Sequence, residues 1–303
     1  MAYSRKIVLP SYDVVFKAIF GREENKPLIV SLLSSILTLD VRELEDLVIL
    51  NSELPISRFD EKGSRLDLRL KLKNKTEIDV EIQSYNHVAF SERVLYYWSK
   101  LYNSNLAKGE EYINLNKCIV IIFLDFSLYE DLTMHSIFKI YEAQRHLLFS
   151  EHLEIHMIEL PKIEAYNKAI DNPLLVSWME FLNVRSEHDM ADLKMKDDLP
   201  EEILMALDEL DKLSQDPNMR EQALNKEMWI RDEIMRLNFA KNAEKDGLQR
   251  GFEKGMKQGL EQGLEQGLLE GKKISAKNLK SLGFDFEVIK AATGLDIETI
   301  EKL

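Results

Sequence analysis

The feature that most constrains the fold is the stretch from residue 65 to residue 83, RLDLRLKLKNKTEIDVEIQ, in which apolar and polar residues alternate in two runs. An alternation with a period of two predicts two β-strands, each with one face buried. If both apolar faces lie on the same side and residues 73–75 form the turn, the numbers of facing residues sum to 148. This register places Asp67 directly opposite Glu81.

The facing pair Asp67 and Glu81 is an exception on the polar face of the predicted hairpin. Directly opposed side chains have Cβ atoms about 4.5–5.5 Å apart, and like charges at that distance are destabilising. The same register makes two favourable pairs, namely Arg69 with Asp79 and Lys71 with Glu77. A divalent cation between the two carboxylates would offset their repulsion, whereas the alternative is a salt-bridged surface sheet without a site.

Four segments, taken in order, resemble a known family. An acidic residue on one strand and Glu-x-Gln on the next, followed by a helix, are similar to the PD-(D/E)xK nuclease superfamily. More closely, the chain resembles the recombination-promoting nucleases (Rpn family), which also carry the label transposase. The resemblance extends over nearly the whole chain and is carried by SYDVVFKAIFG (11–21), DVEIQ (79–83), ERVLYYWSKLYNSNLAKGEEY (92–112) and a glycine-spaced tail.

This resemblance implies an α/β fold. Its restriction-endonuclease-like core has a mixed central sheet flanked by helices, and a helical C-terminal region with a Gly-x-x-x repeat follows. The expected divisions are a nuclease-like core at 1–165, a helical region at 166–243, the glycine repeat at 244–273 and a small helical tail at 274–303.

The resemblance also implies a catalytic site formed by Asp67, Glu81 and Gln83. Asp67 and Glu81, with the backbone carbonyl of Ile82, would hold Mg²⁺, for which Mn²⁺ would be a substitute; the ion would lower the pKa of a bound water. The chain departs from the superfamily pattern in two ways, since Leu66 precedes Asp67 in place of proline and Gln83 replaces lysine. A neutral amide orients water only by hydrogen bonds, so activation would depend more heavily on the metal.

Further candidate residues lie on two predicted helices. Asp13 is a candidate outer-shell or second-metal carboxylate, although helix capping explains it equally well. The candidates for binding DNA phosphates are Lys17, Arg93, Tyr96 and Lys100. For all four, the alternative interpretation is a solvated helix face.

Charge and composition limit the classes of partner. The net charge of −13 disfavours a general nucleic-acid binder, but residues 1–130 contain 17 basic and 19 acidic residues, a net of −2, so most of the acidity lies beyond them. A catalytic face within residues 1–130 can therefore bind DNA. The only cysteine is Cys118, and the longest apolar run, residues 118–124, is too short to span a bilayer. These observations predict a cytoplasmic protein without a membrane partner.

The rest of the core is predicted from periodicity and capping residues. Ser91 is a candidate N-cap for a helix that ends near residue 107. The order of elements matches a nuclease core: helical residues 13–39, a strand at 44–50, the hairpin, the helix at 91–107, and strands at 118–124, 134–142 and 152–160.

Glycine recurs at every fourth position near the C-terminus, and an apolar residue follows each of the first six glycines. Glycine costs a helix about 0.8–1 kcal/mol relative to alanine, so seven cost roughly 6 kcal/mol. Close packing in an oligomer with right-handed winding would offset this cost, while disorder until a partner binds is the alternative. The acidic final helix favours contact with protein over contact with DNA. The seven glycines are Gly247, Gly251, Gly255, Gly259, Gly263, Gly267 and Gly271.

The sequence therefore predicts a metal-dependent DNA endonuclease of the recombination-promoting type, which forms homo-oligomers through its C-terminal region. The alternative is a catalytically silent nuclease fold that acts as an oligomeric protein-interaction module. Strand transfer by a true transposase is disfavoured because nothing in the sequence indicates end-specific recognition of DNA.

Overall fold

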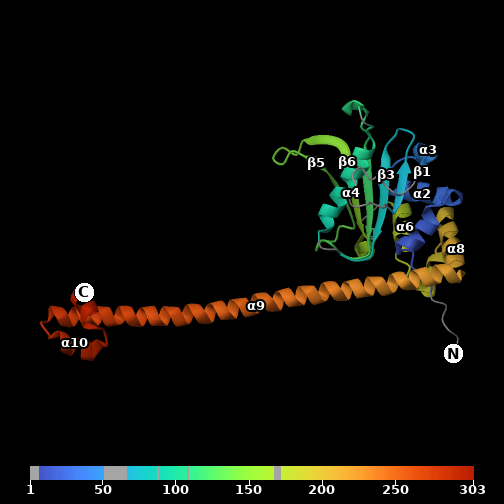
Figure 1. Ribbon diagram of the computed structural model, residues 1–303. Helices are drawn as coiled ribbons and strands as arrows, with labels where there is room; N and C mark the ends of the chain where they lie inside the picture. Colours follow the sequence, from blue (N-terminus) through green and yellow to red (C-terminus); the bar gives the residue numbers. More distant parts are fainter. Residues whose placement is uncertain (1–6, 51–66, 87–88, 108, 167–171) are drawn as a thin grey trace, which may run out of the picture. The chain divides into compact units, whose positions relative to one another are not determined.

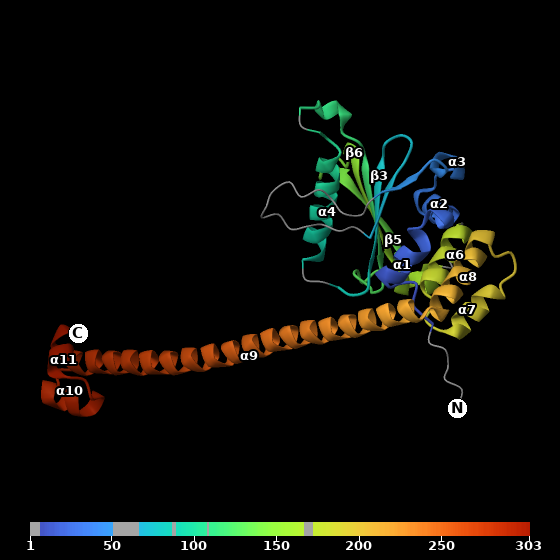
Figure 2. The same ribbon diagram turned by 45° about the vertical axis from the view of Figure 1, so that its right-hand side comes forward.

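The computed structural model describes residues 7–50, 67–86, 89–107, 109–166 and 172–303. The chain divides into two compact units, Met1–Asp232 and Glu233–Leu303. The first unit contains the sheet and the helices that pack on it (Figures 1 and 2). Residues 51–66, which include the first two residues of the predicted hairpin, lie outside the described residues.

A six-stranded mixed sheet forms the centre of the first unit, with the strand order β1-β2-β3-β4-β6-β5. The pairs β3–β4 and β4–β6 are parallel and the other three pairs are antiparallel. This mixed sheet with flanking helices confirms the predicted restriction-endonuclease-like fold. The strands are β1 (Val48–Leu50), β2 (Leu68–Lys71), β3 (Glu77–Gln83), β4 (Cys118–Leu124), β5 (His135–Tyr141) and β6 (Leu148–Glu159).

Helices cover both faces of the sheet (Figures 1 and 2). One face packs against α1, α2, α6 and α8 in the main hydrophobic core, and the other packs against α4. The helices of this unit are α1 (Asp13–Phe20), α2 (Lys26–Leu37), α3 (Val41–Leu44), α4 (Phe90–Ser104), α5 (Ile163–Tyr166), α6 (Pro173–Leu182), α7 (Glu187–Lys194) and α8 (Glu201–Gln215), with short 3₁₀ turns at Glu23–Asn25, Tyr112–Asn114 and Leu160–Lys162.

Strand β4 shows why the sheet needs cover on both sides. All seven of its residues are buried. Ile119, Ile121 and Phe123 enter the main core, whereas Val120, Ile122 and Leu124 pack on the side of α4. A continuous apolar run of this kind suits a strand with parallel neighbours and helices on both faces.

The hairpin has the register predicted from its alternation. Leu68 pairs with Val80 and Leu70 with Ile78, so the facing numbers sum to 148. The apolar residues of both strands enter the main core. Strand β2 is half-buried as predicted, but β3 is buried on both faces up to Ile82 because β3 lies inside the sheet and α4 covers its polar side.

At least three predicted element boundaries are wrong. The strand expected at 152–160 begins earlier, because β6 covers Leu148–Glu159. The strand expected at 44–50 covers only Val48–Leu50, because Asp40 and Glu43 form a capping box that starts α3 instead. The N-cap of α4 is Ala89, in a left-handed conformation with φ 62°, and not Ser91, which lies inside the first turn.

The glycine repeat is helical throughout. It lies in α9 (Pro217–Ser281), which begins in the first unit and continues in the second. In the second unit, α10 (Phe286–Thr293) and α11 (Ile297–Lys302) pack with the end of α9 around a small core. That core consists of Ala276, Ile289, Leu295 and Ile300.

Candidate active site

Asp67 and Glu81 lie side by side at the open end of the hairpin. The backbone N–H of Asp67 donates to Glu81 Oε1 at 3.1 Å, and the N–H of Ile82 donates to Asp67 Oδ2 at 3.2 Å. Each carboxylate therefore accepts from the backbone of the opposite limb. The structure thus brings together the two acids that the register of the hairpin placed opposite each other.

Gln83 and Arg93 extend this pair into a chain of hydrogen bonds. The Gln83 amide donates to Glu81 Oε2 at 3.0 Å, and the Arg93 guanidinium donates to Gln83 Oε1. Gln83 keeps a second N–H and a second lone pair beyond these two bonds. The amide is therefore oriented on both sides and can still bind a water or a substrate oxygen. The sum of 148 for facing residues predicts Arg65 opposite Gln83, but Arg65 lies outside the described residues.

Helix α1 contributes two of the predicted residues. Lys17 Nζ lies 2.9 Å from Asp67 Oδ1. Asp13, the first residue of α1, pairs with Lys226 of α9 at 3.0 Å, and the N-cap of α1 is Tyr12. The two ends of α1 thus face the site through one acidic and one basic side chain.

A cavity of about 200 Å³ lies beside Asp67 and Glu81, and Lys17 is not among its lining residues. Arg93 and Tyr97 of α4 line it, whereas Tyr96 and Lys100 are not among its lining residues; the Lys100 ammonium lies 5.5 Å from the centre of the Tyr96 ring. Sequence reasoning missed Tyr97, Lys226 and Trp229, and no local pattern marks them. The lining consists of Asp13, Asp67, Glu81, Ile82, Gln83, Ser84, Tyr85, Arg93, Tyr97, Lys226 and Trp229.

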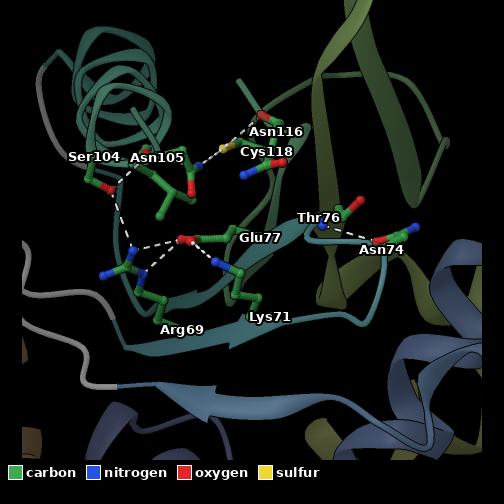
Figure 3. Close-up of polar contacts among 10 residues, drawn as sticks. Arg69, Lys71, Asn74, Thr76, Glu77, Ser104, Asn105, Asn116 and Cys118 are labelled. Carbon is green, nitrogen blue, oxygen red and sulfur yellow. Dashed lines mark hydrogen bonds and ion pairs between the residues drawn. The ribbon is translucent and has the colours of Figure 1, made fainter. Parts of the chain in front are cut away.

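Asp79 is a further acidic residue that sequence reasoning did not assign to the site. Its backbone faces Arg69 as predicted, but Arg69 points diagonally and holds Glu77 Oε2 at 2.7 and 3.0 Å. Figure 3 shows Glu77 between Arg69 and Lys71. Asp79 is 1% exposed, and neither of its carboxylate oxygens has a hydrogen-bond partner among the described residues. The predicted Arg69–Asp79 ion pair is therefore wrong.

The burial of Asp79 and Glu81 makes their ionised forms unfavourable. Burial raises the pKa of Glu81 to about 8, and the neighbouring Asp67 carboxylate contributes to that rise. Burial, followed by the charges of Glu81 and Asp67, also raises the pKa of Asp79 well above its ordinary value. Both carboxyl groups therefore hold their protons more tightly than exposed carboxyl groups do.

These residues fit a hard divalent cation. Magnesium and manganese prefer oxygen ligands, and two carboxylates from neighbouring strands supply them beside a polar cavity. Asp79, whose carboxylate oxygens have no hydrogen-bond partner among the described residues, lies two residues before Glu81 on the same strand. Among the described residues no three His, Cys, Asp or Glu side chains are arranged to hold a metal, so a backbone carbonyl and water would have to complete the coordination.

We expect the Asp79→Asn substitution to stabilise the metal-free protein at alkaline pH. A carboxyl group whose pKa is raised by folding keeps its proton in the folded protein after it has ionised in the unfolded chain. The folded state therefore loses stability as the pH rises from the ordinary pKa through the raised one. At pH about 8 the variant should exceed the wild type in the free energy of unfolding by at least about 1.4 kcal/mol, the equivalent of one unit of raised pKa, because the amide carries no charge whose burial opposes folding. The difference should shrink as the pH falls through about 4, the ordinary pKa of Asp, and vanish only well below it, where the carboxyl is protonated in both states.

Urea denaturation in the presence of a chelator at several pH values measures this difference. Glu77→Gln is the matched control, because it removes a buried carboxylate from the same strand but leaves Arg69 without its partner, and it should destabilise the protein. A lower stability of Asp79→Asn at pH about 8 would contradict the expected effect of the unpaired carboxyl.

A comparison with models of known protein families shows to which family this chain belongs. A family model described as "PD-(D/E)XK nuclease family transposase" matches residues 10–240. The chain belongs to this family. The match includes the sheet, the cavity and the part of α9 that carries Lys226 and Trp229. Searches of curated proteins and of solved structures found no match.

Membership of this nuclease family agrees with the fold and with the two acids of the hairpin. Nucleases of the PD-(D/E)XK family generally use divalent metal ions. Within the described residues, no helix has both the length and the apolar composition needed to cross a membrane.

Proposed function

We propose that this chain is a metal-dependent endonuclease that hydrolyses DNA phosphodiesters, of the recombination-promoting type. The observation that carries the proposal is the convergence of Asp67 and Glu81 from neighbouring strands beside a polar cavity. Asp67, Glu81 and the Ile82 carbonyl would hold Mg²⁺ or Mn²⁺, and Asp13 would act as an outer ligand. When bound, the ion would polarise the phosphate and make water a better nucleophile.

The side chains around the cavity have complementary tasks. Gln83, fixed by Glu81 and Arg93, would orient the attacking water with its remaining N–H or lone pair. Arg93 and Lys226 line the cavity and would attract the DNA phosphate, with Lys17 beside Asp67. Tyr96 and Lys100, farther along α4, would contact the phosphate backbone outside the cavity.

Plasmid nicking tests the proposal. Purified wild-type protein should nick supercoiled DNA when Mg²⁺ or Mn²⁺ is added, and Asp67→Ala should reduce nicking to the background level because one of the two carboxylate ligands is lost. Asp67→Asn keeps an acceptor for the Ile82 N–H and controls for damage to the hairpin. Absence of metal-dependent nicking by the wild type, or equal nicking by folded Asp67→Asn, would refute the proposal.

The second candidate function is a catalytically silent module that acts through protein contacts. The exposed apolar residues of the glycine repeat favour it, because a long apolar stripe in contact with water is typical of a surface that another chain covers. Under this function, the wild type and Asp67→Asn would be equally inactive. We do not propose strand transfer, since DNA hydrolysis accounts for the site.

We also propose that the chain self-associates through its C-terminal region and acts in the cytoplasm. The glycine repeat is helical and the apolar residues that follow its first six glycines are exposed, which supports packing against another chain. The single cysteine, Cys118, is buried and unpaired, which is consistent with a reducing compartment.

A further inference from the structure

Two exposed stripes run beside each other along the glycine repeat of α9. One consists of the seven glycines, and the other consists of the apolar residues that follow the first six of them. Apart from neighbouring residues and the backbone of its own helix turn, a Cβ atom added at any of these seven glycines would meet no described atom within 4 Å. The apolar residues that follow the first six glycines are 63–71% exposed, and they are Leu248, Phe252, Met256, Leu260, Leu264 and Leu268. A long apolar stripe in contact with water indicates a surface that another chain covers.

The spacing of the repeat requires a partner that winds around the helix. Four residues of an α-helix turn by about 400°, so each stripe advances by about 40° per repeat. A period longer than about 3.6 residues favours right-handed winding. Only another helix can follow both stripes over their whole length, with its apolar side chains lying against the glycines.

The charges beside the stripes suit a second copy that runs in the opposite direction. Residues 247–258 contain Arg250, Lys254 and Lys257 with one acid, Glu253, for a net charge of +2. Residues 259–270 contain three acids and no base, for a net charge of −3. A parallel pair in register would place like charges together, whereas an antiparallel pair places the basic half against the acidic half.

An antiparallel pair also places the large apolar residues of one helix against the glycines of the other. If residues 257 and 258 lie at the twofold axis, the numbers of facing residues sum to 515. Each of the six apolar side chains then faces a glycine of the other copy, for example Leu268 against Gly247 and Leu264 against Gly251. The missing glycine side chains let the helices approach closely, and the apolar side chains fill the space.

We propose that residues 247–271 of two copies of this chain pair as antiparallel helices with right-handed winding. This inference rests on the proposed self-association and adds its orientation and register. It does not depend on nuclease activity. DNA cleavage and pairing can therefore fail independently of each other.

Cross-linking of single-cysteine variants tests the orientation. The background is the full chain with Cys118→Ala, since Cys118 is the sole cysteine. Arg250, Gln258 and Gln266 each precede a glycine and so border the glycine stripe. In the antiparallel pair, residue 250 lies near residue 266 of the other copy, and residue 258 lies near its own equivalent. Residues 250 and 266 of one helix are about 24 Å apart.

Three outcomes are expected with a bismaleimide whose two reactive ends lie about one helical turn apart. Gln258→Cys should cross-link to itself, and Arg250→Cys and Gln266→Cys should each fail alone. Co-expression of Arg250→Cys with a size-tagged Gln266→Cys should give a mixed cross-linked dimer. Self-cross-linking of both end variants would overturn the antiparallel orientation in favour of a parallel one.

Light scattering of the uncross-linked protein separates failure of the orientation from failure of self-association. A monomer would overturn both self-association and the antiparallel pair, and the stripes would then belong to a different partner. A dimer without any cross-link at residue 258 would place the contact elsewhere and overturn the inference. Plasmid nicking by the same samples reports on the endonuclease separately.

Discussion

Replacing Glu81 with Gln is expected to lower the rate of DNA cleavage by about 10²–10³-fold, the loss typical of removing one preorganised electrostatic group. Glu81 lies beside Asp67 and holds the Gln83 amide. An amide of the same length keeps an acceptor for the Asp67 N–H but loses the negative charge that would bind a cation. Initial rates of plasmid nicking at saturating Mn²⁺ measure the effect.

The same substitution should remove the stabilisation of the protein by metal. A ligand that binds only the folded state at about 100 times its Kd stabilises that state by about 2.7 kcal/mol. We expect Mn²⁺ to raise the thermal midpoint of the wild type and to leave that of Glu81→Gln nearly unchanged. This measurement does not depend on catalysis, so it also detects metal bound at an inactive site.

The raised pKa of Glu81 gives the metal affinity a defined dependence on pH. The group has a pKa of about 8 in the folded protein, so a proton must leave before a cation can bind below that pH. The apparent Kd for Mn²⁺ should therefore fall by about tenfold for each unit of pH between about 6 and 8, and this trend should disappear in Glu81→Gln.

Glu77→Gln is a suitable control for the cleavage measurement, because Glu77 is a buried acid of the same strand that is held by Arg69 and Lys71 away from the cavity (Figure 3). The folded fraction of this variant should retain cleavage. Unchanged cleavage and unchanged stabilisation by Mn²⁺ in Glu81→Gln would together show that Glu81 is not a metal ligand.

Replacing Trp178 with Ala is expected to lower the free energy of unfolding by about 3–5 kcal/mol, the usual cost of deleting a large buried aromatic side chain. Trp178 of α6 is fully buried, and its ring lies 5.5 Å from that of Phe20 and 5.8 Å from that of Phe181. Its indole N–H donates to Ser31 Oγ at 3.2 Å. The substitution would leave both a cavity and a hydroxyl without its partner.

Trp229→Ala provides the matched control, because Trp229 is 49% exposed and lines the active-site cavity. Its removal should cost far less stability in urea denaturation. Equal losses from the two tryptophans would show that α6 does not anchor the core. Because Phe20 ends the helix that carries Asp13 and Lys17, Trp178→Ala should also lower cleavage at temperatures near its unfolding midpoint.

The comparison between Tyr96 and Tyr97 shows where sequence reasoning reached its limit. A helix turns by about 100° per residue, so the choice of the face that points to the site depends on how the helix packs. Arg93 and Tyr97 line the cavity, whereas Tyr96, which the sequence singled out in place of Tyr97, does not. Local periodicity identifies the helix, while its rotation is set by packing of Phe90 and Val94 on the sheet.

Asp79 shows the same limit for electrostatics. The register correctly placed its backbone opposite Arg69. The long arginine side chain reaches a diagonal neighbour as easily as a direct one, and Glu77 receives it together with Lys71. Register therefore fixes which backbones face each other and does not fix which charges pair.

The sequence by itself determined the hairpin, its register and the opposition of Asp67 to Glu81, because strand alternation is a local property in which a slip of one residue would expose every apolar side chain. It also identified the family through motifs in their order along the chain. Only the tertiary structure decided that Lys226 and Trp229 of α9 line the cavity, and that Asp79 is buried with no hydrogen-bond partner in the described part of the chain. These properties arise from contacts between segments far apart in the chain, and such contacts leave no periodic trace in the sequence.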